Sequence, residues 1–452
     1  MQGARTLITR CLTALLGVLL MALLVSCAPG AAQRPSSDSA QSQDAEQAGP
    51  HTTLVSDFHN ADLGCGWQPT GSLELRHAHC FTVDYFDGGY ALICTADGSR
   101  YLVVPPKSEV PDGLAPDIVA LRQPLSDVYL AASDTLCLLE ALGAEDVVSV
   151  SGIERDDWYS ERMQQAMDQG RVAYGGKYRT PDYELLLGKG VLLALESTMI
   201  NHAPTVRDKL VELGIPVFVE LSSYEDDPLG RVEWVRLYGV LLNKDEQAAQ
   251  VLEQQERQVE AISTQPTGKR MAFFYFNASG TPVVRKPGDY VTKMIQMAGG
   301  TYAFDELEQA AAGSSTTTLT MEQFYATAKD ADVLVYNTSI DEDVRSLDDL
   351  LQKNGLLADF KAVQSGDVWV TEHNMYQQMV ESGSIIADFN HALKGTDEGV
   401  THLQRLTTAV RAPAPSTGPQ SATRKVSERS ERGADCQSVE GTGARAATTR
   451  VA

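Results

Sequence analysis

The sequence DEQAAQVLEQQERQVEAIS, residues 245–263, predicts a single helix about 28 Å long. It contains neither Gly nor Pro and is dominated by strong helix formers. Asp245 can cap its first turn, and Gln265-Pro266 ends it because a residue before proline is disfavoured in helical conformation. A polar helix of this length is typical of a connection between two bodies. On this stretch alone, an ordinary surface helix of one domain is the alternative.

The chain on both sides of this helix alternates between predicted strands and helices. Before it, helical segments separate the strand-like runs VYLAA, VVSVSG, VLLAL and PVFVE, and after it KRMAFFYFN, DVLVYNT and GDVWVTE repeat the pattern. Strands joined by helical crossovers predict parallel sheets, whose ligands lie at the carboxyl ends of the strands. We therefore predict an α/β protein with two Rossmann-like lobes, residues 53–244 and 264–410, joined by the helix 245–263.

Residues 72–105 show a different pattern, with period-two alternation interrupted by Asp-Gly pairs at 87–88 and 97–98. This pattern predicts a β-meander with tight turns at the start of the first lobe. We expect His77 and Cys80 to lie in one alternating strand and to point away from one another. No metal site is therefore predicted from the neighbouring group of candidate ligands, which comprises His59, Cys65, His77, His79 and Cys80.

The two ends of the chain have a composition unlike the rest. Residues 1–27 combine early arginines with a short apolar run, which is typical of a secretory signal. The ending Leu-Val-Ser-Cys resembles a bacterial lipobox, which implies that Cys27 becomes the lipidated first residue; an ordinary signal peptide or an uncleaved anchor is the alternative. Residues 28–52 predict a disordered tether and residues 411–452 a disordered tail, which is either native or a product of the gene model.

Composition excludes several classes of protein. A length of 452 residues favours at least two domains, and 43% hydrophobic with 21% charged residues is typical of a globular chain. The formal charge of −23 argues against nucleic acid as a partner. Export permits disulfides among Cys65, Cys80, Cys94 and Cys137, although their pairing does not follow from sequence.

Several separate segments resemble the periplasmic-binding-protein family that delivers iron–siderophore complexes, haem or cobalamin to ABC importers. These are ALGAEDVVSVSG, PDYELLLGKGVLLALES, the linking helix and VRKPGDYVTKMIQMAGGTYAF, and the likeness spans residues 70–398. The resemblance implies a class III fold, in which one helix joins two lobes and the cleft closes only slightly. The predicted meander departs from the minimal pattern of this family.

The resemblance also implies a docking function for two glutamates. In this family each lobe presents one glutamate near the start of a helix to arginines of the permease, and the matching positions are Glu184 and Glu322. A carboxylate in a first helical turn is favoured by the helix dipole and can pair with arginine on a partner. Ordinary helix capping is the alternative explanation of both residues.

Candidate ligand contacts lie in the loops that follow predicted strands. Aromatic side chains offer large contact area to a flat or greasy chelate, and basic ones suit its negative charge. Residues 132–134 form one such loop. The individual candidates are Trp158, Tyr174, Lys177, Tyr178, Arg179, Tyr224, Arg285, Tyr290, Tyr336, His373 and Tyr376.

These features predict a monomeric, lipid-anchored, extracytoplasmic solute-binding protein that delivers an iron chelate to an ABC permease and has no cofactor of its own. Haem and cobalamin are alternatives of the same class, followed by a bare metal ion or a sensor lipoprotein. The sequence lacks a nucleophile elbow, a Walker loop and an HExxH motif, so no catalytic residue is assigned and an enzyme is not expected.

Overall fold

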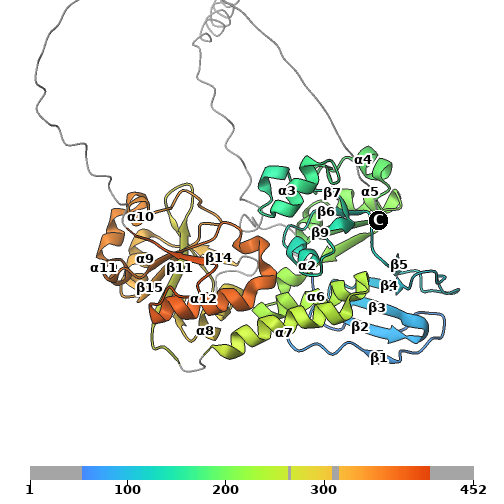
Figure 1. Cartoon of the computed structure of the whole chain (residues 1–452), viewed down its shortest axis with the longest axis horizontal. Helices are drawn as coiled ribbons and strands as arrows, with labels where there is room; N and C mark the ends of the chain where they lie inside the picture. Colours follow the sequence, from blue (N-terminus) through green and yellow to red (C-terminus); the bar gives the residue numbers. More distant parts are fainter. Residues whose placement is uncertain (1–52, 263–265, 308–314, 408–452) are drawn as a thin grey trace, which may run out of the picture. The chain divides into compact units, whose positions relative to one another are not determined.

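The computed structural model describes residues 53–262, 266–307 and 315–407, which contain three β-sheets (Figure 1). Two of the sheets carry helical crossovers, and the third precedes them in the chain. Cys27, the tether 28–52 and the tail 411–452 lie outside the described residues. Within the described residues, no helix combines the length and the apolar character needed to cross a membrane.

The first lobe is built on a fully parallel sheet whose strand order is β10-β9-β6-β7-β8. Its strands are β6 (Val128–Leu130), β7 (Val148–Ser151), β8 (Ala173–Tyr174), β9 (Leu193–Ser197) and β10 (Val217–Glu220). Its helices are α2 (Thr135–Ala141), α3 (Glu161–Asp168), α4 (Tyr183–Lys189), α5 (Pro204–Glu212) and α6 (Pro228–Leu242). Apart from the short edge strand β8, the strands are mostly buried apolar runs, as expected for a parallel sheet covered by helices.

The second lobe has a mixed sheet of order β14-β12-β11-β15-β16-β17, with β13 paired to β11. Its strands are β11 (Arg270–Phe276), β12 (Pro282–Arg285), β13 (Thr301–Tyr302), β14 (Thr316–Thr318), β15 (Val333–Tyr336), β16 (Val368–Thr371) and β17 (Leu403–Arg405). Its helices are α8 (Tyr290–Met297), α9 (Met321–Ala328), α10 (Leu347–Lys353), α11 (Lys361–Ser365) and α12 (Ser382–Lys394). The parallel centre was predicted, whereas the antiparallel strands β12, β14 and β17 were not.

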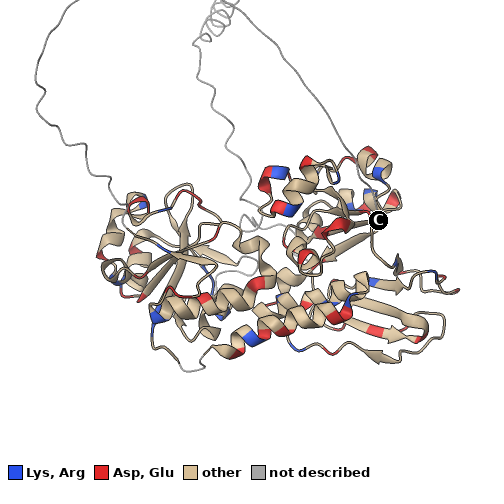
Figure 2. Cartoon of the chain, viewed as in Figure 1, with Lys and Arg blue, Asp and Glu red and all other residues tan. Residues whose placement is uncertain are grey.

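The linking helix is α7 (Asp245–Ala261), and it lies beside α6 of the first lobe and α12 of the second (Figure 1). Most of its charged positions are acidic (Figure 2). Asp245 lies in the first turn and does not cap it, because the cap position is Lys244 and makes no side-chain bond. The expected end at Gln265-Pro266 partly lies outside the described residues, and the helix itself ends at Ala261.

The third sheet is the N-terminal addition, with strand order β1-β2-β3-β4-β5. Its strands are β1 (Gly71–Ser72), β2 (Phe81–Phe86), β3 (Tyr90–Thr95), β4 (Arg100–Val104) and β5 (Ile118–Arg122). Strands β2, β3 and β4 form the antiparallel meander that the alternation predicts, while β5 joins β4 in parallel. The mixed α/β class with parallel sheets is therefore confirmed, together with a meander at the start of the chain.

The prediction of a strand through residues 73–80 was wrong, because two buried carboxylates hold this segment in another conformation. Glu233 accepts hydrogen bonds from the backbone N–H groups of residues 76–78 at 2.7–3.1 Å. Glu225 accepts from the N–H groups of His79 and Cys80 at 2.8–3.1 Å. Each carboxylate therefore satisfies backbone donors that a strand would have paired with a neighbouring strand.

Candidate functional site

A small cavity between the two lobes marks the candidate ligand site. Its volume is about 20 Å³, which is room for about one water molecule. We call it the interlobe cavity, and the residues that line it are Asp134, Arg231, Tyr290, Met294, Met375, Tyr376, Met379, Ser382 and Ile385. The first two belong to the first lobe and the others to the second, so the cavity is where the lobes meet.

Arginine and tyrosine side chains dominate the polar surface of this cavity. The Arg231 guanidinium lies 3.7 Å from the centre of the Tyr290 ring, within the range of a cation–π interaction. Arg285 is buried, donates a hydrogen bond to the Tyr376 hydroxyl and lies over that ring at 5.2 Å. Asn337 donates a second hydrogen bond to Tyr376 at 2.7 Å, so the Tyr376 hydroxyl is held by Arg285 at the end of β12 and by the residue that follows β15.

One acidic side chain of the first lobe, Asp134, lines the cavity, and a second, Glu220, interacts with it electrostatically. Burial raises the pKa of Asp134, and it raises that of Glu220 well above the usual range, with the Asp134 charge adding to the effect on Glu220. The Ser222 hydroxyl and backbone N–H both donate to Glu220 at 2.9 Å. The first lobe therefore contributes carboxyl groups whose charged form burial disfavours, whereas Arg285 is contributed by the second lobe.

Direct contacts between the lobes close the site. The Tyr159 hydroxyl donates to Glu342 at 2.7 Å, and its backbone N–H donates to Gln377 at 3.1 Å. Lys293 forms an ion pair with Asp226 at 2.5 Å. A solute larger than water can enter only if such contacts open, so the structure represents a closed arrangement of the cleft.

Three of the predicted ligand residues, Arg285, Tyr290 and Tyr376, meet at or beside the interlobe cavity. Two others lie in the cores. Trp158 is 1% exposed and donates to the Ser151 hydroxyl at 3.0 Å, whereas Tyr336 is fully buried and donates to Asp341 at 2.5 Å. Their aromatic character therefore reflects packing within each lobe.

The remaining predicted ligand residues do not line the cavity. Tyr174 is exposed at the end of β8, and Lys177 and Arg179 are exposed in the loop before α4. The Arg179 guanidinium lies 5.4 Å from the ring of half-buried Tyr178. Tyr224 is half-buried against the first-lobe core. The His373 ring lies 3.0 Å from the Thr338 carbonyl oxygen.

The sequence prediction missed several residues that line the cavity, among them Arg231 and Met379. Arg231 belongs to a helix that follows a strand end, so its position after β10 was the available signal. Its guanidinium is oriented by the backbone carbonyls of Ser223 and Glu225, at 2.7 and 3.0 Å. No sequence pattern identifies such carbonyl acceptors in advance.

The two predicted docking glutamates occupy equivalent places in their lobes. Glu184 and Glu322 are exposed in the first turns of α4 and α9. The caps of these helices are made by Asp182 and by Thr320, the latter in a reciprocal capping box with Gln323. Neither glutamate is therefore the N-cap of its helix, although each is placed where the helix dipole favours a carboxylate.

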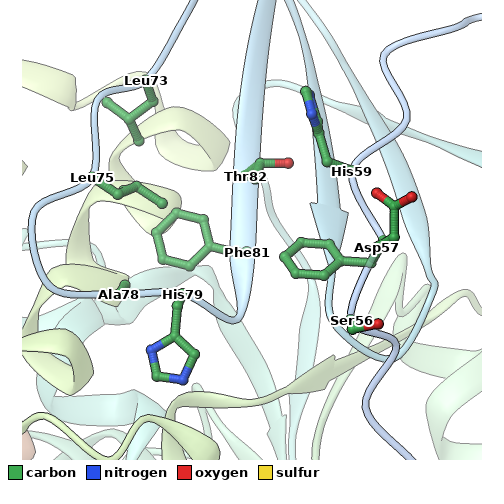
Figure 3. A pocket seen from close by; sticks show the side chains of 10 residues that line it. Ser56, Asp57, His59, Leu73, Leu75, Ala78, His79, Phe81 and Thr82 are labelled. Atoms are coloured by element: carbon green, nitrogen blue, oxygen red, sulfur yellow. The ribbon is translucent and has the colours of Figure 1, made fainter.

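A second pocket, of about 380 Å³, lies in the N-terminal addition (Figure 3). In this view Leu73, Leu75 and Phe81 are separated from Asp57 and His59 across the pocket. Its lining residues are Ser56, Asp57, Phe58, His59, Leu73, Leu75, Ala78, His79, Phe81 and Thr82. The pocket shares no lining residue with the interlobe cavity.

One group of potential metal ligands borders this pocket, comprising His79, Cys80 and Glu225. Their ligand atoms lie within 4.8 Å of one another, which contradicts the assumption that strand alternation governs this segment. His77 points elsewhere, toward Glu256 at 2.9 Å. Cys80 is one of four free cysteines in the described part of the chain, with Cys65, Cys94 and Cys137.

Comparison with known proteins places the chain in a family. Residues 128–374, more than half of the chain, match the family model described as periplasmic binding protein. The chain belongs to the periplasmic binding protein family, whose members are solute-binding proteins of ABC transport rather than enzymes. It is therefore a protein that binds a solute for an ABC importer.

The relatives include two uncharacterised lipoproteins of Methanocaldococcus jannaschii. One is 25% identical over 317 residues, which are 66% of this chain and 73% of the relative. The other is 23% identical over 316 residues, which are 67% of this chain and 78% of the relative. Homologues of this chain are thus named as lipoproteins.

Similar solved structures include a periplasmic haem-binding protein of Vibrio cholerae, with 17% identity and a TM-score of 0.47, covering 58% of this chain and 97% of that one. A petrobactin-binding protein of Bacillus subtilis shows 14% identity and a TM-score of 0.47, covering 61% and 93%. A periplasmic binding protein of Veillonella parvula shows 18% identity and a TM-score of 0.49, covering 64% and 97%.

Proposed function

We propose that this protein is a lipid-anchored receptor that captures an iron chelate between its lobes and delivers it to an ABC permease. The observation that supports this proposal is the meeting of Arg231, Tyr290 and Tyr376, contributed by both lobes, around one closed cavity, with Arg285 packed against Tyr376. A solute held between them would contact both lobes at once, and its binding would favour the closed arrangement.

The chemistry of these side chains favours an anionic chelate. Guanidinium groups bind carboxylate and catecholate oxygens through paired N–H donors, and tyrosine rings cover flat apolar surface at low entropic cost. Exposed Lys177 and Arg179 add positive charge to the surface of the first lobe. Haem, whose propionates are anionic, is the next candidate of the same class, and cobalamin follows.

A bare metal ion is a weaker candidate because of where the potential ligands lie. Among the described residues, the group that could hold an ion is His79, Cys80 and Glu225, which is not part of the interlobe cavity. Glu225 already accepts hydrogen bonds from His79, Cys80 and the Trp234 ring. Its carboxylate is therefore committed to holding the segment in place.

The protein would be attached to the membrane and would deliver its chelate to the permease through separate parts of the chain. The protein would be a monomer, held at the outer face of the cell membrane by lipid on Cys27. The names of the homologues support a lipoprotein. Glu184 and Glu322 would pair with arginines of the permease, one from each lobe. Their exposure and their equivalent positions in first helical turns support this role.

A thermal-shift panel on the protein lacking residues 1–27 tests the ligand class. It contains ferric hydroxamates and catecholates, haem, cobalamin, and Fe, Mn and Zn ions. A true ligand at about 100 times its Kd stabilises the fold by about 2.7 kcal/mol, which moves the midpoint by a few degrees. We expect a ferric chelate to produce this shift and the bare ions to produce none.

Two matched variants test whether the chelate binds at the interlobe cavity. Arg285→Gln should reduce the chelate-induced shift, whereas Arg171→Gln, an exposed arginine paired with Asp146, should retain it. The midpoint of each unliganded variant shows whether it has folded. No shift from any chelate, or a shift from a metal ion alone, would contradict the proposed function.

A further inference from the structure

The cleft holds one buried carboxylate oxygen that lacks a partner. In the described part of the chain, Oδ1 of Asp134 accepts no hydrogen bond, although the residue is only 7% exposed. Neighbouring Glu220 differs, because Ser222 donates two hydrogen bonds to it. Glu196 is also buried without partners, but it does not line the interlobe cavity, whereas Asp134 does.

The position of Asp134 is one where a solute is expected. It lies between β6 and α2, at the carboxyl end of a central strand of the parallel sheet. Ligands of such sheets bind at these strand ends. The second lobe covers this end of the sheet with Tyr290 and Met379, which line the same cavity.

The guanidinium of Arg231, which lines the same cavity, has partners other than Asp134. Arg231 donates to two backbone carbonyls and lies over the Tyr290 ring. An unpaired buried carboxylate oxygen lowers the stability of the fold, since its lost hydration is not replaced. A side chain that costs stability at a ligand-binding position is typical of a group whose partner arrives with the ligand.

We infer that Asp134 receives a protonated amine of the bound solute, so that the solute is an iron chelate carrying a free amino group. A neutral hydroxyl would satisfy the oxygen but would bring no positive charge to the carboxyl, and the Arg231 guanidinium in the same cavity donates its hydrogen bonds to backbone carbonyls instead. An ammonium group supplies both the hydrogen bond and the opposite charge. This inference rests on the proposed function and specifies its ligand further.

The other charged side chains around the cavity suit a solute that carries both an amine and iron-binding oxygens. Asp134 and Arg231 line the cavity from the first lobe, and Arg285 lies beside it in the second lobe, with Asp289 at 3.7 Å. A chelate that directs its amine toward Asp134 would direct its iron-binding oxygens toward the arginines and tyrosines. The site thus fixes the orientation of the solute as well as its class.

The test compares two ferric chelates that differ only in this amine. Ferrioxamine B carries a protonated terminal amine, and its N-acetylated form carries a neutral amide at the same atom. Titration of the unmodified protein should show binding of the amine form about tenfold tighter or more, as expected for one charge-assisted hydrogen bond. Asp134→Asn should abolish this preference, and the exposed matched control Asp208→Asn should keep it.

The possible results separate this inference from the proposed function. Equal binding of the two chelates, or a preference that persists in Asp134→Asn, overturns the amine inference while chelate capture stands. Failure of every chelate in the thermal-shift panel overturns both. The first comparison uses the unmodified protein, so it holds even if the Asp134 variant does not fold.

Discussion

Two buried glutamates show how single residues shape the start of this protein. Glu225 and Glu233 accept hydrogen bonds from five successive backbone N–H groups of residues 76–80. The segment passes so close to α6 that a Cβ on Gly230 would lie 2.9 Å from the His77 carbonyl oxygen. Carboxylate acceptors and a glycine together permit this close approach without leaving donors unpaired.

His77 in this segment should make stability depend on pH. Its Nε2 lies 2.9 Å from Glu256 of α7, and its Nδ1 lies 3.7 Å from Asp227, the N-cap of α6. Asp227 raises the pKa of His77, burial opposes it, and Glu256 adds to it. A raised folded-state pKa means that the stabilisation is fully present below about pH 6.5 and is lost as pH rises through the folded value.

We therefore expect His77→Gln to lower the free energy of unfolding more at pH 5.5 than at pH 9. Urea unfolding of both proteins across this pH range measures the difference in their free energies of unfolding. The pH dependence that comes from titratable groups common to both proteins cancels in this difference. Asp227→Asn keeps a capping side chain but removes its charge, so it should reduce the pH dependence contributed by His77. This account would be contradicted if His77→Gln lowered the free energy of unfolding by the same amount at every pH.

At the scale of elements, glycines allow α7 to contact helices of both lobes. A Cβ at Gly239 of α6 would lie 2.6 Å from the Ala248 side chain, and one at Gly383 of α12 would lie 2.5 Å from the Gln255 carbonyl oxygen. The Gln255 side chain also accepts a hydrogen bond from the Gly383 N–H at 3.0 Å. A polar residue of α7 is thus buried and paired, which explains how a helix with few apolar residues packs so closely.

Gly383→Ala should destabilise the protein by about 1–3 kcal/mol, because the added methyl group meets the backbone of α7 and cannot be accommodated by a rotamer change. Gly188→Ala is the matched control, since no atom lies within 4 Å of the added Cβ in α4 and alanine favours a helix there. Denaturant unfolding measures both. Equal stability of the two variants would show that α7 and α12 separate at little cost.

At the scale of the molecule, the lobes meet through polar contacts of partly exposed side chains and through Met379 and Val380, which pack into the core of the first lobe. Tyr159 donates a hydrogen bond to Glu342, and Lys293 forms an ion pair with Asp226; these side chains are partly exposed. Such pairs contribute little stability individually. They suit a cleft that opens for a solute and closes again, while α7 stays packed against both lobes.

In the proposed function, delivery of the chelate to the permease depends on two exposed glutamates outside the cleft. The double variant Glu184→Ala/Glu322→Ala should therefore bind ferric chelate normally but fail to support its uptake. Loss of both carboxylates removes the proposed pairing with permease arginines and leaves the cleft intact. Uptake of labelled chelate in cells that express only the variant is the measurement, with binding by the purified protein measured in parallel.

The matched control is Glu161→Ala/Glu398→Ala, which removes two exposed glutamates at other positions. This control should support uptake. Undiminished uptake by the Glu184/Glu322 variant would contradict the docking proposal, and lost chelate binding would show that the variant had disturbed the fold.

The sequence by itself determined the lobes, the linking helix and the meander, because hydrophobic periodicity within a segment is a local property. Only the tertiary structure decided the conformation of residues 73–80, since the carboxylates that hold it lie 145–157 residues away. The same holds for the cleft, where Arg285 was predicted and Arg231 was not. Strand ends mark where a site forms, but which side chains meet there depends on how the two lobes close.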